Sequence, residues 1–193
     1  ARCLASLRRQ TRRPESIVVV DHDSAEVPSA EREALKRAFP EVAWVHAPNG
    51  GYAAGANRVV ELALRSAPGV EFVLVLNPDV ELEPDFAHET IEAMAIRSQV
   101  ALASGKLLRP GGRLIDSAGI VMGRSRRFRD RGSEEPDDGS YGAVETVFAV
   151  SGAALMLRCA ALAALALEGE LFDEDFFTYH EDTDLAWRAK QLG

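Results

Sequence analysis

The sequence predicts an α/β fold in which helices flank a doubly wound, mostly parallel sheet. Short apolar runs rich in β-branched residues alternate with segments of helical periodicity. Such runs are typical of strands that are covered on both faces, as the strands of a parallel sheet are. Alternating strands and helices also place ligands at the carboxyl ends of the strands, so the residues that follow each strand are the first candidates for a site.

The individual elements follow in a regular order as far as residue 98. Strands are expected over residues 16–20, 42–45 and 71–76, and helices over residues 2–11, 29–38, 52–66 and from beyond Pro84 to about Ser98. An alanine-rich helix is expected over residues 160–167, and a last helix from residue 181 to the end. A length of 193 residues fits one domain.

Residues 105–142 interrupt this rhythm with Gly-, Arg- and Asp-rich sequence, which predicts a mobile loop or a β-rich excursion. Within it, the arginine-rich run 123–131 is followed by four acidic residues between 134 and 138. Charge runs of this kind are usually solvated loops. A lid whose arginines meet phosphates is the second interpretation.

Composition argues against several classes of protein. A net charge of −8 and a pI near 5.1 give no basic field for nucleic acid or for an anionic membrane. Cys3 and Cys159 lack a CxxC or His partner, so neither a disulfide framework nor a zinc site is indicated, and a reducing cytoplasm is expected. No apolar run approaches the roughly 20 residues that span a bilayer.

Two carboxylates follow predicted strands and therefore lie at the expected ligand-binding edge. Asp21 comes directly after the strand 16–20 and can accept hydrogen bonds from a nucleobase or a ribose, with Asp23 and Ser24 in the turn after it. Asp79 follows the strand 71–76, and a carboxylate there suits a divalent cation bound to a diphosphate. An Asx turn or a Pro-Asp turn would explain either residue equally well.

A glycine-rich segment, residues 49–57, joins a predicted strand to a predicted helix. Its glycines permit close backbone approach, and the N-terminus of the following helix offers unpaired N–H groups to a phosphate. The segment does not match GxGxxG, and tight helix packing explains small residues equally well.

The richest cluster of chemical groups spans residues 172–188, where aromatic side chains surround several carboxylates. Glu181, Asp182 and Asp184 fall in the first turn of the last predicted helix. The helix dipole explains one or two of these charges, but not their packing with aromatic residues. A partly enclosed Asp there can act as a general base, whereas His180 is expected to make local hydrogen bonds.

In this order, these segments resemble the family 2 glycosyltransferases with the GT-A fold, especially the rhamnosyltransferase-like bacterial branch. The resemblance covers nearly all 193 residues. It is carried by residues 3–7, 17–21, 49–57, 76–80, 150–154, 172–177 and 181–188. Relative to that family, the chain begins after the expected first strand and stops before the expected C-terminal part, so we expect this segment alone to be poorly stable or inactive.

The resemblance also implies a role for each candidate residue. Asp182 matches the catalytic base, with Glu181 beside it, and Asp79 would be the sole protein ligand of Mg²⁺ or Mn²⁺ because Asn77 replaces the first acid of the family's DxD-type motif. The remaining assignments are donor binding by Asp21, Asn49, Gly51, Asn57, Asn77 and Asp79, an acceptor side at Ser151, Gly152 and His180, and support of the helix and loop by Asp184 and Arg188.

The implied reaction is transfer of a sugar, with inversion, from a nucleoside-diphosphate donor to a hydroxyl of a glycan or lipid-linked acceptor. The branch points to rhamnose and to cell-envelope polysaccharide. It also points to the cytoplasm, including the inner face of the plasma membrane, with peripheral membrane association through regions outside this chain. Nucleic acid is not an expected partner.

Two alternatives stay open at this stage. Residues 20–23, Val-Asp-His-Asp, resemble the strand-end motif of haloacid-dehalogenase-like phosphatases, although no lysine motif follows. A non-catalytic sugar-nucleotide-binding module is the other alternative.

Overall fold

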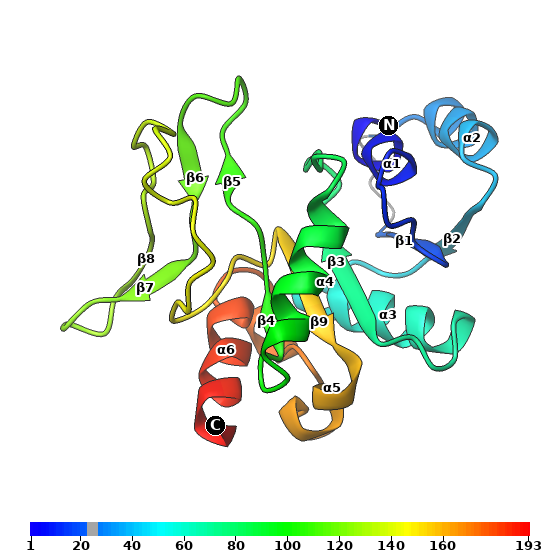
Figure 1. The fold of residues 1–193 in the computed structure, drawn as a ribbon. Helices are drawn as coiled ribbons and strands as arrows, with labels where there is room; N and C mark the ends of the chain where they lie inside the picture. Colours follow the sequence, from blue (N-terminus) through cyan, green and yellow to red (C-terminus); the bar gives the residue numbers. More distant parts are fainter. Residues whose placement is uncertain (23–26) are drawn as a thin grey trace.

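A computed structural model describes residues 1–22 and 27–193, in which helices and small sheets alternate (Figure 1). Asp23 and Ser24 lie outside the described residues. The helices are α1 (Arg2–Arg8), α2 (Ser29–Ala38), α3 (Gly51–Ser66), α4 (Phe86–Ile96), α5 (Cys159–Leu165), the 3-10 helix η1 (Glu174–Phe176) and α6 (Glu181–Leu192). The strands are β1 (Ile17–Asp21), β2 (Val42–His46), β3 (Phe72–Leu76), β4 (Leu102–Ala103), β5 (Leu107–Leu108), β6 (Ile115–Ser117), β7 (Ile120–Met122), β8 (Phe128–Asp130) and β9 (Ala154–Arg158). The α/β class predicted from the sequence is confirmed.

The first two strands pair as expected for a parallel sheet. β1 and β2 run in register from Ile17 opposite Val42 to Asp21 opposite His46. Parallel pairing requires a crossover between the strands, and α2 lies within that connection. Leu4 of α1 packs with Phe39 and Val42 in a small apolar cluster against this sheet.

The second sheet differs from the expected mostly parallel arrangement. β9 lies between β3 and β4 and is antiparallel to both, with Leu76 opposite Ala154 and Leu102 opposite Leu157. The reason is that the chain re-enters this sheet only after residues 105–142, and β9 then runs in the direction opposite to β3. Parallel pairing among the described strands is therefore confined to β1 and β2.

Helix α3 packs against both sheets, since it contacts β1 and β3 (Figure 1). Its small residues Ala53 and Ala56 are buried, which places the helix close to the main core formed with β3 and β9. Tight packing thus accounts for part of the small-residue pattern in 49–57. Within the described ranges, β1 is paired only with β2, and the central strand that the family resemblance implies stays a prediction.

Residues 105–142 hold two short antiparallel pairs, β5–β6 and β7–β8, on the side of the molecule away from α1 (Figure 1). The base of the β7–β8 hairpin packs against the segment before β9 and against α6. Ile120 is buried in a cluster with Ala149 and with Ala186 of α6. Among the helices that the structure describes, none combines the length and apolar character needed to cross a bilayer.

Candidate active site

The centre of the candidate site is the carboxylate of Asp182 in the first turn of α6. Its Oδ2 accepts a hydrogen bond from the backbone N–H of Gly152 at 2.9 Å, and its Oδ1 accepts one from Thr183 N–H at 2.7 Å. Gly152 lies just before β9, so this contact joins α6 to the edge of the second sheet. The two backbone donors fix the orientation of a half-buried carboxylate.

Asp79 belongs to the same edge of that sheet. Leu76, the last residue of β3, pairs with Ala154, the first residue of β9, and Asn77 N–H donates to Ala153 O at 2.9 Å. The turn that carries Asp79 therefore emerges beside the segment that holds Asp182. Asp79 is exposed and accepts no hydrogen bond or ion pair from the described residues.

Glu181 stands next to Asp182 but in a different environment. Its side chain is 5% exposed, and its Oε2 has no hydrogen-bond partner within the described ranges. Burial raises the pKa of this carboxyl, and the neighbouring Asp182 carboxylate raises it further. A buried oxygen without a partner requires an explanation, and a bound ligand that donates a hydrogen bond would supply one.

Tyr52 was assigned no role from the sequence, yet it contacts the same segment. Its hydroxyl donates to Gly152 O at 2.6 Å, and burial, followed by Glu181 and Asp182, raises the pKa of the phenol. Its place at the start of α3, directly after two glycines, was the available signal. A Cβ at Gly152 would lie 3.0 Å from this hydroxyl, so residue 152 has little room for a side chain.

The N-terminus of α3 is occupied by protein, which corrects the expectation that its N–H groups are unpaired. Phe177 O accepts from Ala53 N–H at 3.3 Å, and Asn49 Oδ1 accepts from Gly51 N–H at 3.0 Å. Gly51 has φ +83°, and a Cβ there would lie 2.2 Å from Phe177 O. The glycine-rich turn is thus matched to the loop that precedes α6 rather than open to a phosphate.

That loop has an unusual backbone, with positive φ at three residues other than glycine: Phe177, Tyr179 and His180. Such conformations are uncommon, carry strain and concentrate at functional sites. Phe177 and Tyr179 are exposed, at 53% and 77%. The loop therefore presents aromatic side chains next to the first turn of α6.

Asn57 uses its whole amide in contacts within the protein. Its Nδ2 donates to Phe172 O at 2.8 Å and to Glu174 Oε1 at 2.9 Å, while its Oδ1 accepts from Phe172 N–H at 2.9 Å. These bonds hold α3 against the segment that leads to η1. Donor binding by Asn57 stays a prediction that would require these bonds to open.

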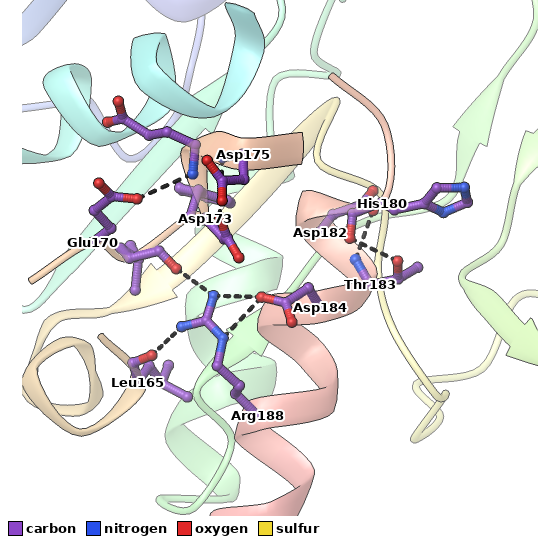
Figure 2. Close-up of polar contacts among 12 residues, drawn as sticks. Leu165, Glu170, Asp173, Asp175, His180, Asp182, Thr183, Asp184 and Arg188 are labelled. Carbon is purple, nitrogen blue, oxygen red and sulfur yellow. Dashed lines mark hydrogen bonds and ion pairs between the residues drawn. The ribbon is translucent and has the colours of Figure 1, made fainter. Parts of the chain in front are cut away.

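The remaining candidates are more dispersed. Asp21 lies at the end of β1 and its Oδ2 is 3.4 Å from Arg32 Nη1, on the first sheet rather than beside Asp182. Ser151 Oγ accepts from Ala153 N–H at 3.3 Å, next to Gly152. The His180 ring lies 6.4 Å from the Phe128 ring and points away from the Asp182 carboxylate (Figure 2).

Asp184 and Arg188 form the support for α6 that the family resemblance implied (Figure 2). Arg188 donates from Nε to Asp184 Oδ2 at 2.9 Å and from Nη2 to Leu171 O at 2.7 Å, and its Nη1 donates to Leu165 O. One guanidinium thus joins α6 to the end of α5 and to the segment before η1. This confirms a structural role for the pair.

Asp79 is the candidate metal-binding residue of the described chain, on the chemistry of its carboxylate. The described residues contain no group of three or more His, Cys, Asp or Glu side chains that could hold a cation. Asp79 is exposed without a protein partner, so it is free to act as one ligand while phosphate oxygens complete the coordination. Metal binding by Asp79 as the sole protein ligand stays a prediction.

A groove of about 700 Å³ lies elsewhere, between α3 and α5, and its lining includes His22, Arg58 and Glu170. None of Asp79, Glu181 and Asp182 lines it. We place the candidate active site at the sheet edge because the oriented and unpartnered carboxylates lie there.

The close fit between Gly51 and Phe177 gives a testable consequence. Gly51→Ala would add the strain of a positive φ and a clash with a backbone oxygen, and we expect a loss of at least about 3 kcal/mol of unfolding free energy. Gly69→Ala is the matched control, because Gly69 has φ +90° but nothing within 4 Å of the added Cβ, so its loss should be about 1 kcal/mol. Urea unfolding of both variants measures the difference. Equal losses would show that the contact with Phe177 does not constrain residue 51.

A comparison with protein families assigns the chain to a family whose chemistry is compatible with this site. The sequence model described as Glycosyl transferase family 2 matches residues 1–151, which include the turn of Asp79 and end just before Gly152. A comparison with curated proteins found no match. Neither the phosphatase nor the non-catalytic alternative gains support, since the match is to transferases and Asp23 lies outside the described residues. The chain belongs to glycosyl transferase family 2 and is a glycosyltransferase.

Proposed function

We propose that this glycosyltransferase is an inverting enzyme in which Asp182 is the general base and Asp79 is the metal-binding residue on the donor side. One observation carries the proposal: the segments of an oriented carboxylate, Asp182, and an unpartnered one, Asp79, are joined at the same end of the β3–β9 pair. That end is where ligands bind in related α/β folds.

The proposed chemistry is a single displacement. The acceptor hydroxyl gives its proton to Asp182 while its oxygen forms a bond to the anomeric carbon of the donor. The bond from that carbon to the diphosphate oxygen breaks, and the nucleoside diphosphate leaves with the electron pair. Attack and departure on opposite faces invert the configuration. The N–H groups of Gly152 and Thr183 hold the Asp182 carboxylate in place for this step.

Glu181 and the segment before β9 form the acceptor side of the proposed site. The unpartnered Oε2 of Glu181 is buried, so we propose that the site opens to let it accept a hydrogen bond from a second acceptor hydroxyl, which would orient the sugar toward Asp182. Gly152 bonds to the first turn of α6, Ser151 precedes Gly152 in the chain, and His180 is the residue before the helix. We propose Glu181, Ser151, Gly152 and His180 as the acceptor contacts.

On the donor side, Asp79 is proposed to hold Mg²⁺ or Mn²⁺, which would offset the charge of the departing diphosphate. Asn77 and Asp21 are the proposed donor contacts, and Asn49 and Gly51, which bond to each other, are proposed to shape the donor pocket. A nucleoside-diphosphate sugar is the donor class, and a glycan or lipid-linked hydroxyl is the acceptor class. Resemblance to the rhamnosyltransferase-like branch makes deoxythymidine-diphosphate rhamnose the first donor to test and cell-envelope polysaccharide the proposed product.

Replacing Asp182 by Asn should abolish transfer and leave nucleotide binding largely intact. Asn keeps a side-chain oxygen for Gly152 N–H but is a far weaker base, so a loss of at least about a hundredfold in kcat is expected. Nucleoside diphosphate release and calorimetric binding of the nucleotide measure the two effects. Asp184→Asn is the matched control on the same turn and should retain transfer. Undiminished turnover of Asp182→Asn would reject the base assignment.

Replacing Asp79 by Ala should remove the dependence of nucleotide binding on Mn²⁺, because the proposed protein ligand is lost. Calorimetry with and without Mn²⁺ measures this, and wild type should bind the nucleoside diphosphate at least about tenfold more tightly with the ion. Glu81→Ala is the control, since that nearby carboxylate is ion-paired with Arg2. If wild type and Asp79→Ala respond to Mn²⁺ alike, Asp79 is not the ligand.

Burial of Glu181 predicts a pH-dependent stability. The folded-state pKa of this carboxyl is raised, so the folded protein favours its protonated form. The free energy of unfolding is therefore higher at low pH and falls as pH rises through that pKa, because the buried carboxyl must then ionise. Glu181→Gln stays uncharged, so it should unfold at a higher temperature than wild type at pH 8, with the difference vanishing near pH 4. Thermal melts across this range provide the test. A variant that is less stable than wild type at pH 8 would contradict the assignment.

A further inference from the structure

The tip of the β7–β8 hairpin carries a concentrated positive charge that nothing in the proposed mechanism uses. Arg124, Arg126 and Arg127 lie in the turn, Arg129 lies in β8, and all four are exposed. None of them forms an ion pair with a residue that the structure describes, whereas Arg131, just beyond the hairpin, pairs with Glu145. The tip is therefore electropositive although the chain has a net charge of −8.

The acidic residues that follow in the sequence do not neutralise this tip. Asp137 pairs with Lys106 at 2.5 Å, Glu134 lies 3.3 Å from Arg109, and Glu135 accepts from the Tyr141 hydroxyl at 2.8 Å. The charge segregation in the sequence thus persists in space. Arginines without acidic partners repel one another, and an anionic partner would relieve this repulsion. The cluster therefore points to an anionic partner.

The hairpin is built as a fixed projection. Ile120 exchanges backbone hydrogen bonds with Ala149 at 2.7 and 3.2 Å, and the Phe128 ring packs against Phe148 at 5.3 Å between centroids. The turn is closed by the bond from Gly123 N–H to Arg127 O at 2.9 Å. In Figure 1 the hairpin extends from the side of the molecule opposite α1.

The protruding shape of the β7–β8 hairpin favours binding to an extended anionic surface over binding to a small anion. The arginines follow one another in an exposed turn, and hairpin residues line neither the groove between α3 and α5 nor the one beside β3 and α4. Met122, immediately before the turn, is 37% exposed, so an apolar side chain accompanies the arginines. Basic residues beside an exposed apolar residue suit the headgroup region of a bilayer.

We propose that the β7–β8 hairpin docks this glycosyltransferase on a bilayer that contains anionic phospholipids. Arg124, Arg126 and Arg127 contact the lipid phosphates, and Met122 enters the interface. Phe128, paired with Met122 beside the turn, contacts His180, the residue that precedes α6, so docking places the first turn of α6 close to the surface. This inference does not depend on the catalytic roles proposed above.

Vesicle co-sedimentation of the full chain tests this inference. The probes are vesicles of phosphatidylcholine alone and vesicles of equal parts phosphatidylcholine and phosphatidylglycerol, at low and high salt. Wild type should bind only the anionic vesicles, and high salt should release it. The variant R124Q/R126Q/R127Q should bind about a hundredfold more weakly, at roughly fivefold for each charge removed.

Two further variants separate this site from a general charge effect. R124K/R126K/R127K keeps the charge and should retain wild-type binding. R9Q/R12Q/R13Q removes the same charge from the exposed end of α1 and the segment after it, across the molecule from the hairpin, and should also retain it (Figure 1). Circular dichroism confirms that each variant is folded.

Three results would overturn the proposal: no binding of wild type to anionic vesicles at low salt, equal losses in the two glutamine variants, or binding to single-stranded RNA that anionic vesicles do not displace. The last result would assign the hairpin to a nucleic acid instead. Selective loss in R124Q/R126Q/R127Q alone supports the bilayer.

Discussion

The arrangement of the site depends on one peptide, that of Gly152. Its N–H donates to Asp182 and its carbonyl accepts from the Tyr52 hydroxyl, so a single residue connects the lead-in to β9 with both α6 and α3. A side chain would meet Tyr52 and Asp182 at once, which is why glycine fits this point. Because β9 is the central strand of its sheet, the position of the Asp182 carboxylate is tied to the most buried part of the core.

The sequence predicted local elements well where local signals agreed. The bounds of α2 were predicted correctly, and β1, β2 and β3 lie within one residue of the expected runs, because β-branched residues are bounded by charged or Pro-containing turns. β9 was not recognised as a strand. Its Ala-Leu-Met-Leu sequence favours helix, and it continues into α5 without a turn. Its burial between β3 and β4 overrides that propensity, which is also why the antiparallel pairing was missed.

The dependence of sequence prediction on local signals also explains which features of the candidate site were predictable. Strand ends share an edge of a sheet, so the position of a carboxylate after a strand, such as Asp79 after β3, could be predicted from spacing alone. Contacts between distant segments carry no local signal. The cap that Phe177 O places on α3 joins residues far apart in sequence, and it turned an expected phosphate cradle into an internal contact. The hydrogen bonds of the Asn57 amide could not be predicted for the same reason, because they join α3 to the segment before η1.

Three carboxylates in one helical turn illustrate how environment, not position, assigns roles. The dipole of α6 favours negative charge at all three alike. Asp184 is neutralised by Arg188, Asp182 is held by two backbone N–H groups, and Glu181 is buried without a partner for Oε2. A group already paired with a guanidinium has little capacity left for a substrate, whereas an oriented acceptor beside an unsatisfied one retains it. The two carboxylates without a cationic partner, Asp182 and Glu181, are therefore the ones that we propose for catalysis.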